Sequence, residues 1–216
     1  MKRLFALLGS VLLTVSCVNL YDTLFSVYAE DTQKCGDNIT WQFDEDTKTL
    51  TLTGTGRMND YSDYQGLPWV DHLLRAEHLV IGDGITAIGS FAFNFLGNIR
   101  EITLPDSVTE IGANAFFGLP VEKVQLSKNL QSIGVLALYG ANLTEVQIPE
   151  GTKTIGESCF TNNPNLTKIT VPDSVTYIGA QGLTRIRNGM RHSAKRAIFS
   201  FSATVFYTSI SAAKRK

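Results

Sequence analysis

Apolar and polar positions alternate in five short segments that recur along the middle of the chain. In each segment two apolar residues stand two positions apart, mostly with a polar residue between them, which is the pattern of a short half-buried strand. A turn signal follows each segment, because proline ends a strand and Asp, Ser, Asn and Gly favour turns. The pattern therefore predicts five strands, each followed by a corner. The segments are Leu-Val-Ile at 79–81, Ile-Thr-Leu at 102–104, Val-Gln-Leu at 124–126, Val-Gln-Ile at 146–148 and Ile-Thr-Val at 169–171.

An Ile-Gly pair marks the same point in every copy and gives the repeat length. The pairs begin at Ile88, Ile111, Ile133, Ile155 and Ile178, so the steps are 23, 22, 22 and 23 residues. A fixed step in this range is typical of a solenoid, in which stacked coils cover one another's apolar faces. We expect each glycine of these pairs either to adopt a positive φ or to lie where the neighbouring coil approaches closely.

A small residue and then a bulky apolar residue follow each isoleucine, four and five positions later. We expect the bulky residues to form one buried file through the stack, with neighbouring strands about 4.8 Å apart. The small residues are Ala92, Ala115, Ala137, Cys159 and Gly182, and the bulky residues are Phe93, Phe116, Leu138, Phe160 and Leu183.

These residues carry a family resemblance. The pattern I-x-(I/L)-P-D-S-V-x-x-I-G-x-x-A-F resembles the BspA-type leucine-rich repeat, a family common on bacterial surfaces. The resemblance covers residues 79–183 and departs only mildly in the third copy, where Ser127 replaces the proline and Leu138 the phenylalanine. It implies a mostly β fold, a right-handed leucine-rich-repeat solenoid of about five 22–23-residue coils, and a role in adhesion or protein recognition.

Residues 30–76 predict a separate module in front of the repeats, which occupy residues 77–183. Alternating segments at 39–43 and 50–52 flank an acidic turn at 44–48, which is the pattern of a β-hairpin. A short helical turn follows from Trp69 to Ala76. We expect this hairpin module to cap the first coil, because an uncovered apolar end and a bare strand edge invite aggregation. Residues 35–61 also resemble the module that often precedes BspA-type repeats.

Two functional interpretations of this module remain open beside the structural one. Asp44, Glu45 and Asp46 could hold calcium, although they lack the interleaved spacing of an EF-hand loop, and a solvated turn explains them as well. Its aromatic residues could form a platform for sugars or the core of the cap. They are Trp41, Tyr61, Tyr64 and Trp69.

Residues 1–29 predict a secretory signal peptide. Lys2 and Arg3 precede an apolar run at 5–15, and small residues stand before a cleavage point near Glu30. The run is shorter than the roughly 20 residues that span a bilayer. An alternative is a lipoprotein signal with Cys17 as the lipidated residue. We therefore expect a secreted or cell-surface monomer that touches a membrane only if Cys17 is lipidated.

Residues 184–216 break the repeat and reverse the charge. The first 183 residues carry 11 basic and 20 acidic side chains, whereas the residues after them carry 8 basic and no acidic side chains. We expect a basic, atypical and poorly ordered tail. It is either an arm for anionic polymers or lipid surfaces or a truncated or frame-altered end.

The outward positions of the repeated strands predict a candidate binding surface. Stacking places equivalent residues side by side, and opposite charges on neighbouring strands attract. The surface is therefore either a polar binding stripe or a charge ladder that pairs with itself. Its first column is His78, Glu101, Lys123, Glu145 and Lys168, and its second column is Val80, Thr103, Gln125, Gln147 and Thr170.

The sequence carries no motif for catalysis, for a cofactor or for a metal. The histidines lack metal-ligand spacing, and the phosphate-binding, nucleophile-elbow and zinc-protease motifs are absent. Glu101 and Glu145 could mimic a glycosidase pair, but Lys123 between them keeps both ionised. Cys35 lies at the N-terminal end and Cys159 in the fourth repeat, so several coils separate them and a disulfide is out of reach. Cys159 fits a buried small side chain rather than a nucleophile.

We therefore expect an exported, non-catalytic module without cofactors that binds an extracellular or host-surface protein and no nucleic acid. The alternatives are a carbohydrate- or cell-wall-binding module that uses the aromatic cap, and a structural spacer.

Overall fold

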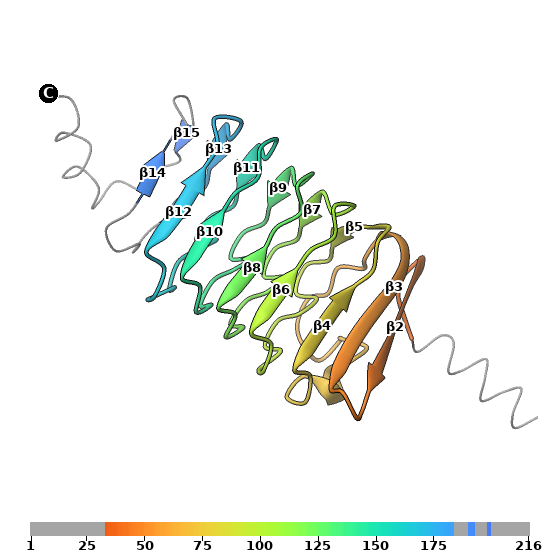
Figure 1. The fold of residues 1–216 in the computed structure, drawn as a ribbon. Coiled ribbons are helices and arrows are strands. Elements are labelled where there is room, and N and C mark those ends of the chain that lie inside the picture. The colour runs from red at the N-terminus through yellow and green to blue at the C-terminus, as the bar shows by residue number, and fades with distance from the viewer. Residues whose placement is uncertain (1–32, 184–189, 193–197, 200–216) are drawn as a thin grey trace, which may run out of the picture.

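The computed structural model describes residues 33–183, 190–192 and 198–199. The chain winds into coils that stack along one axis, beginning at an N-terminal hairpin (Figure 1). The predictions for the signal peptide, for Cys17 and for most of the basic tail lie outside the described residues. Among those residues, none forms a helix with the length and hydropathy needed to cross a bilayer.

Three antiparallel strands form the N-terminal module. They are β1 (Lys34–Gly36), β2 (Asn38–Asp44) and β3 (Thr49–Arg57). β2 and β3 pair in register from Asn38 opposite Thr55 to Asp44 opposite Thr49, which confirms the predicted hairpin. Its turn is held by the Asp44 carboxylate, which accepts hydrogen bonds from the N–H groups of Asp46 at 2.9 Å and Thr47 at 2.8 Å. The acidic turn thus uses one of its carboxylates to stabilise its own backbone.

The hairpin also starts the solenoid, because β3 pairs with both strands of the first coil. Its first half runs parallel to β4 (His78–Ile81), and Gly56 and Arg57 pair with β5 (Ile85–Ile88). A short 3-10 turn, η1 (Val70–His72), connects the module to β4. The module therefore occupies the end of the stack at which β4 and β5 would otherwise have a bare edge, as predicted for a cap.

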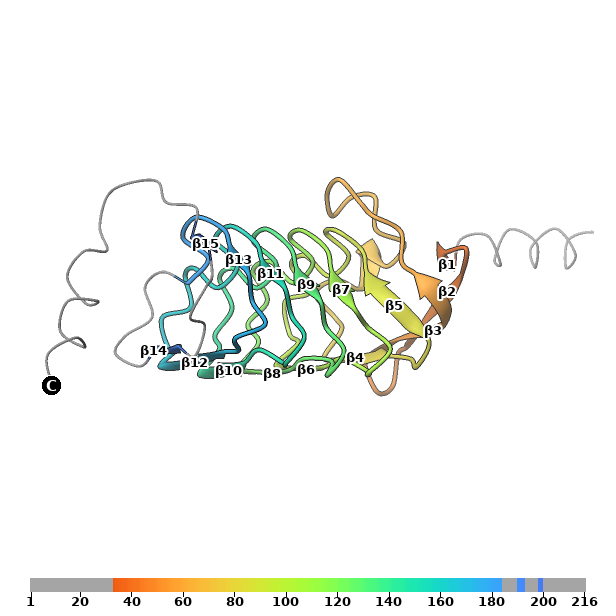
Figure 2. The same cartoon turned by 90° about the horizontal axis from the view of Figure 1, so that it is seen from above.

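Each coil contributes two short strands, and the strands of successive coils form two rows (Figure 2). We call them the first row and the second row. The first row is β4, β6 (Glu101–Thr103), β8 (Lys123–Gln125), β10 (Glu145–Gln147), β12 (Lys168–Val171) and β14 (Met190–His192). The second row is β5, β7 (Glu110–Ile111), β9 (Ser132–Ile133), β11 (Thr154–Ile155), β13 (Tyr177–Ile178) and β15 (Ile198–Phe199).

Parallel pairing in the second row is continuous from β3 to β15. β14 pairs with β12 and β15 pairs with β13, both in parallel. Strand pairing therefore continues beyond Leu183, the residue at which the sequence pattern ends.

The predicted apolar file is confirmed as the centre of the core. Phe93, Phe116, Leu138 and Phe160 are fully buried and belong to one contiguous cluster. The rings of Phe93 and Phe116 stack with centroids 5.4 Å apart. The small residue before each of them is also fully buried, which leaves room for the neighbouring coil. The repeat thus specifies the core one coil at a time.

The glycines of the Ile-Gly pairs lie where neighbouring coils touch. A Cβ atom added to Gly134 would stand 2.6 Å from the backbone nitrogen of Ala113, and one added to Gly156 would stand 2.4 Å from the carbonyl carbon of Gly134. Close approach, and not a positive φ, therefore explains these glycines. A left-handed residue instead occupies the third position after each isoleucine, with φ between 52° and 59°. These residues are Phe91, Asn114, Leu136, Ser158 and Gln181.

Candidate functional site

The outward face of the first row carries every residue of the predicted stripe. All of them are exposed except Thr170, which is half-buried. The apolar partners that alternate with them, such as Ile102 and Val146, are buried in the core. The period of two along each strand thus sends polar side chains to solvent and apolar ones inward.

The charges of the first column form two separate pairs. Lys123 Nζ lies 2.9 Å from Glu101 Oε1, and Lys168 Nζ lies 3.3 Å from Glu145 Oε2. The hydrogen bond that Lys123 donates to Glu101 raises the pKa of Lys123. All four side chains are more than half exposed, so each pair contributes little to stability. Among the described residues, Lys123 forms no ion pair with Glu145, so the predicted ladder is interrupted.

The backbone of the first row is interrupted at the same places. β6 pairs with β8, and β10 pairs with β12, but among the described strands no ladder joins β4 to β6 or β8 to β10. We call these the first break and the second break. The repeat steps do not predict them, because a step of 22 residues separates both the paired β6 and β8 and the unpaired β8 and β10.

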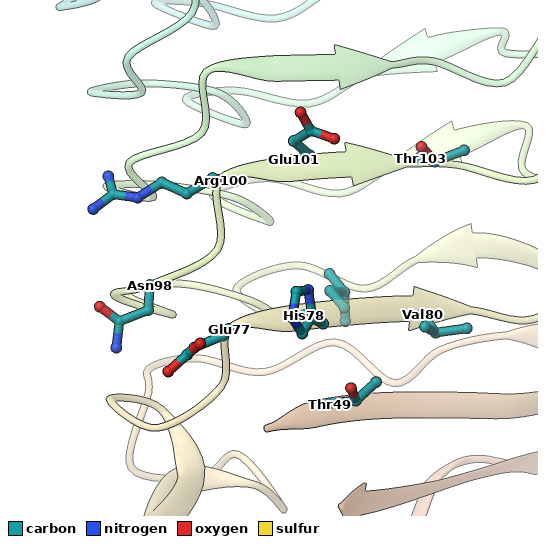
Figure 3. A pocket seen from close by; sticks show the side chains of 9 residues that line it. Thr49, Glu77, His78, Val80, Asn98, Arg100, Glu101 and Thr103 are labelled. Carbon is teal, nitrogen blue, oxygen red and sulfur yellow. The ribbon is translucent and has the colours of Figure 1, made fainter. Parts of the chain in front are cut away.

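A groove with a volume of about 1020 Å³ lies over the first break. Four residues of the predicted stripe line it, namely His78, Val80, Glu101 and Thr103. Four polar lining residues were missed in the sequence, and they are Thr49, Glu77, Asn98 and Arg100. Figure 3 shows Glu77, Asn98 and Arg100 at one end of the groove, His78 and Glu101 in the middle, and Val80 and Thr103 towards the other end.

The polar groups of the groove are only partly used by the protein itself. Asn98 Nδ2 donates to the Leu74 carbonyl at 2.7 Å, and one Arg100 nitrogen donates to the Pro120 carbonyl at 3.3 Å. Within the part of the chain that the structure describes, the side chains of Glu77 and His78 have no hydrogen bond or ion pair. Glu77 and Arg100 could have been found from the sequence, because each stands directly before a stripe residue.

The aromatic residues of the cap mostly form its core. Trp69 is fully buried, and Trp41 and Tyr61 pack against it edge to face, with centroids 5.9 and 6.1 Å away. Tyr64 is the exception, with 44% of its surface exposed. Stacking on a sugar requires an exposed ring face, and Trp69 offers none. The interpretation as a cap core therefore accounts for three of the four rings.

The two cysteines of the described chain are buried free thiols. Burial raises the pKa of Cys35 and of Cys159 to about 12, so both are protonated at neutral pH. A protonated, enclosed thiol is a poor nucleophile. Across residues 33–183 and the two short strands beyond them, no three His, Cys, Asp or Glu side chains converge as metal ligands would.

The chain is similar to a known family of repeats and to solved repeat proteins from bacteria. A family model described as the BspA type leucine-rich repeat region matches residues 72–188, with six copies. A leucine-rich repeat protein from Eubacterium ventriosum is structurally similar, with a TM-score of 0.67 and 27% identity over 74% of this chain. A leucine-rich cell surface protein from Faecalibacterium prausnitzii has a TM-score of 0.52 and 22% identity over 79% of this chain.

The chain spans only part of both solved proteins, since the match covers 43% of each of them. No curated protein sequence matches the chain significantly.

Proposed function

Because the chain belongs to the BspA-type leucine-rich repeat family, we propose that it is an exported, non-catalytic module that binds a protein at the cell surface. The partner would be an extracellular or host-surface protein, bound through the outward face of the first row. The solved relative from Faecalibacterium prausnitzii is a cell surface protein, which supports this location. Adhesion is the function that such binding would serve.

The observation that carries this proposal is the groove over the first break. It brings Glu77, His78 and Arg100 together on an exposed face, and they are not neutralised by ion pairs among the described residues. Polar groups that are not neutralised by ion pairs within the protein are available to bind a partner. The paired charges at Glu101 and Glu145, by contrast, keep the face soluble and support the alternative of a structural spacer.

Reversing two charges on this face tests the proposal. The variant Lys123→Glu/Lys168→Glu removes both ion pairs and adds like charges, and the control Lys128→Glu/Lys153→Glu makes the same change of net charge off the stripe. Binding to immobilised extracellular matrix proteins, measured by surface plasmon resonance, should fall at least about tenfold in the first variant and remain in the control. Equal loss in both would indicate a general charge effect, and no loss would exclude the paired charges from the binding surface. An unmodified chain that binds none of these proteins would support the spacer.

Export requires a separate test. The mass and the N-terminal residue of the mature protein from its native host distinguish cleavage near Glu30 from lipidation at Cys17. An uncleaved chain that is retained inside the cell would contradict the proposal.

A further inference from the structure

At the first break the facing edges of β4 and β6 are not joined in a ladder. In a parallel pair, alternate residues direct their N–H and C=O groups to opposite sides. β4 bonds to β3 through His78, Val80 and Gly82, so Leu79 and Ile81 face β6. β6 bonds to β8 through Ile102 and Leu104, so Glu101 and Thr103 face β4. Three of these four facing residues, Leu79, Glu101 and Thr103, also line the groove.

The width of the break decides what can satisfy these groups. Cα atoms of β4 and β6 approach within 8 Å of each other. A third strand between them would need two strand spacings, about 9.5 Å in all. A polypeptide strand therefore does not fit between β4 and β6. A group that both donates and accepts a hydrogen bond, such as a hydroxyl, can bridge the two edges.

The side chains around the break favour an uncharged ligand. Glu77 and Arg100 carry opposite charges, and the charge of Glu101 is already paired with Lys123. The groove thus has no excess of either sign that would select an anion or a cation. Val80 adds an apolar surface, since 47% of it is exposed. A ligand with many hydroxyl groups and a carbon-hydrogen face matches this combination.

We propose that the groove between β4 and β6 binds an uncharged carbohydrate. Sugar hydroxyls donate to carbonyls of the two strand edges and accept from their N–H groups. Glu77, His78 and Arg100 bind the hydroxyls at the rim, and the carbon-hydrogen face of the sugar packs on Val80. The inference rests on the proposed function, because it names the chemistry that the surface module recognises. A glycan of a glycoprotein and a cell-wall polysaccharide both present this chemistry.

The second break provides a matched control within the same chain. It has the same pattern of facing backbone groups, but Glu122 and Thr144 precede its strands in place of Glu77 and Arg100. The groove variant is Glu77→Ala/His78→Ala, and the control is Glu122→Ala/Thr144→Ala. All four side chains are exposed, so both variants should keep the thermal unfolding midpoint of the unmodified chain.

The test uses an array of neutral and anionic oligosaccharides, followed by titration calorimetry with the neutral oligosaccharide that binds best. The groove variant should bind it at least about tenfold more weakly, and the control should change less than about twofold. Equal affinity of both variants, or binding to anionic sugars only, would overturn the inference.

A second arm separates this inference from the proposed function. Immobilised matrix glycoproteins are compared before and after enzymatic removal of their glycans. Loss of binding after deglycosylation and in the groove variant supports a glycoprotein source for the sugar. Unchanged binding in both cases would leave the proposed function intact and overturn the carbohydrate site. Groove-dependent binding to neutral polysaccharides alone would support the site and contradict protein recognition.

Discussion

The indole ring of Trp69 lies nearly parallel to the phenyl ring of Phe93, with an interplanar angle of 18° and centroids 5.5 Å apart. Trp69 Nε1 also donates a hydrogen bond to the Ala92 carbonyl at 3.0 Å. Trp69 belongs to the hairpin module, whereas Phe93 begins the buried file of the coils. The two residues therefore join the cap to the repeat core, and we expect both parts to unfold together.

Removing the Trp69 ring should destabilise the whole solenoid. Trp69→Ala creates a large cavity at the start of the file, and we expect it to lower the free energy of unfolding by about 3–5 kcal/mol. Trp69→Phe retains an apolar ring but leaves the buried Ala92 carbonyl without its donor, which costs about 1–3 kcal/mol. Guanidinium unfolding followed by circular dichroism measures both. A Trp69→Ala protein whose coils keep the original midpoint would contradict the coupling.

A methyl group at Gly134 should disturb the stack. The new Cβ would meet the backbone of Ala113 at 2.6 Å, and backbone atoms cannot move aside as a flexible side chain can. We expect Gly134→Ala to destabilise by at least about 1–3 kcal/mol, the usual cost of overpacking. Gly66→Ala is the control, because nothing lies within 4 Å of a Cβ there, and it should change stability by less than about 0.5 kcal/mol. Similar unfolding midpoints for the two variants would show that the coils can separate.

The repeat length, the buried file and the hairpin could be predicted because each depends on a pattern of residues that stand close together in the sequence. A strand shows its period of two within three residues, and Phe93 and Phe116 stand at the same distance after an Ile-Gly pair. The left-handed residues could not be predicted in this way. Phe91, Asn114 and Leu136 share a backbone conformation but no residue type.

The candidate site was predicted only in part for a related reason. His78, Glu101 and Thr103 were found because they alternate with buried residues on their strands. The breaks do not follow from the local pattern, because the same pattern occurs on paired and unpaired strands. The groove, and with it the role of Arg100, therefore required the three-dimensional structure.

Asn163 should contribute more to stability than Asn94, although both are buried. Asn163 Nδ2 donates to the Leu138 and Phe160 carbonyls at 2.9 and 3.0 Å, and Oδ1 accepts from the Leu143 N–H at 3.2 Å. Asn163→Ala leaves these backbone groups unsatisfied and should cost at least about 2 kcal/mol.

Asn94 is the comparison, because its Oδ1 has no hydrogen-bond partner among the described residues. Asn94→Ala should cost less than about 1 kcal/mol when the unfolding of both variants is measured by urea titration. The reverse order of the two effects would contradict this hydrogen-bond assignment.

Stability should decline at alkaline pH partly because of Cys159. Burial raises the pKa of its thiol to about 12, above the value of about 8.5 expected in the unfolded chain. The contribution of the protonated thiol is therefore complete below about pH 8.5 and is lost as the pH rises towards 12. Cys159→Ala introduces the residue that Ala137 provides one coil earlier, and it should show a shallower decline of urea midpoints between pH 7 and pH 10.

Thiol labelling gives an independent check. Cys159 should resist iodoacetamide in the folded protein and react after unfolding, because its side chain is fully buried. Cys35 retains its own raised pKa in the Cys159→Ala variant, so Cys35→Ala/Cys159→Ala should show the smallest alkaline decline. Identical pH profiles for all three proteins would exclude the thiols as the cause.

The two rows make two sides of the solenoid differ in how continuously their strands are hydrogen-bonded. Strand pairing is continuous along the second row from β3 to β15, whereas the first row has its first break after β4 and its second break after β8. A pulling force along the solenoid axis would therefore bend the solenoid about the second row and widen the two breaks before any coil unfolds. An adhesive module built in this way would yield under tension at two fixed points, one of them the groove itself.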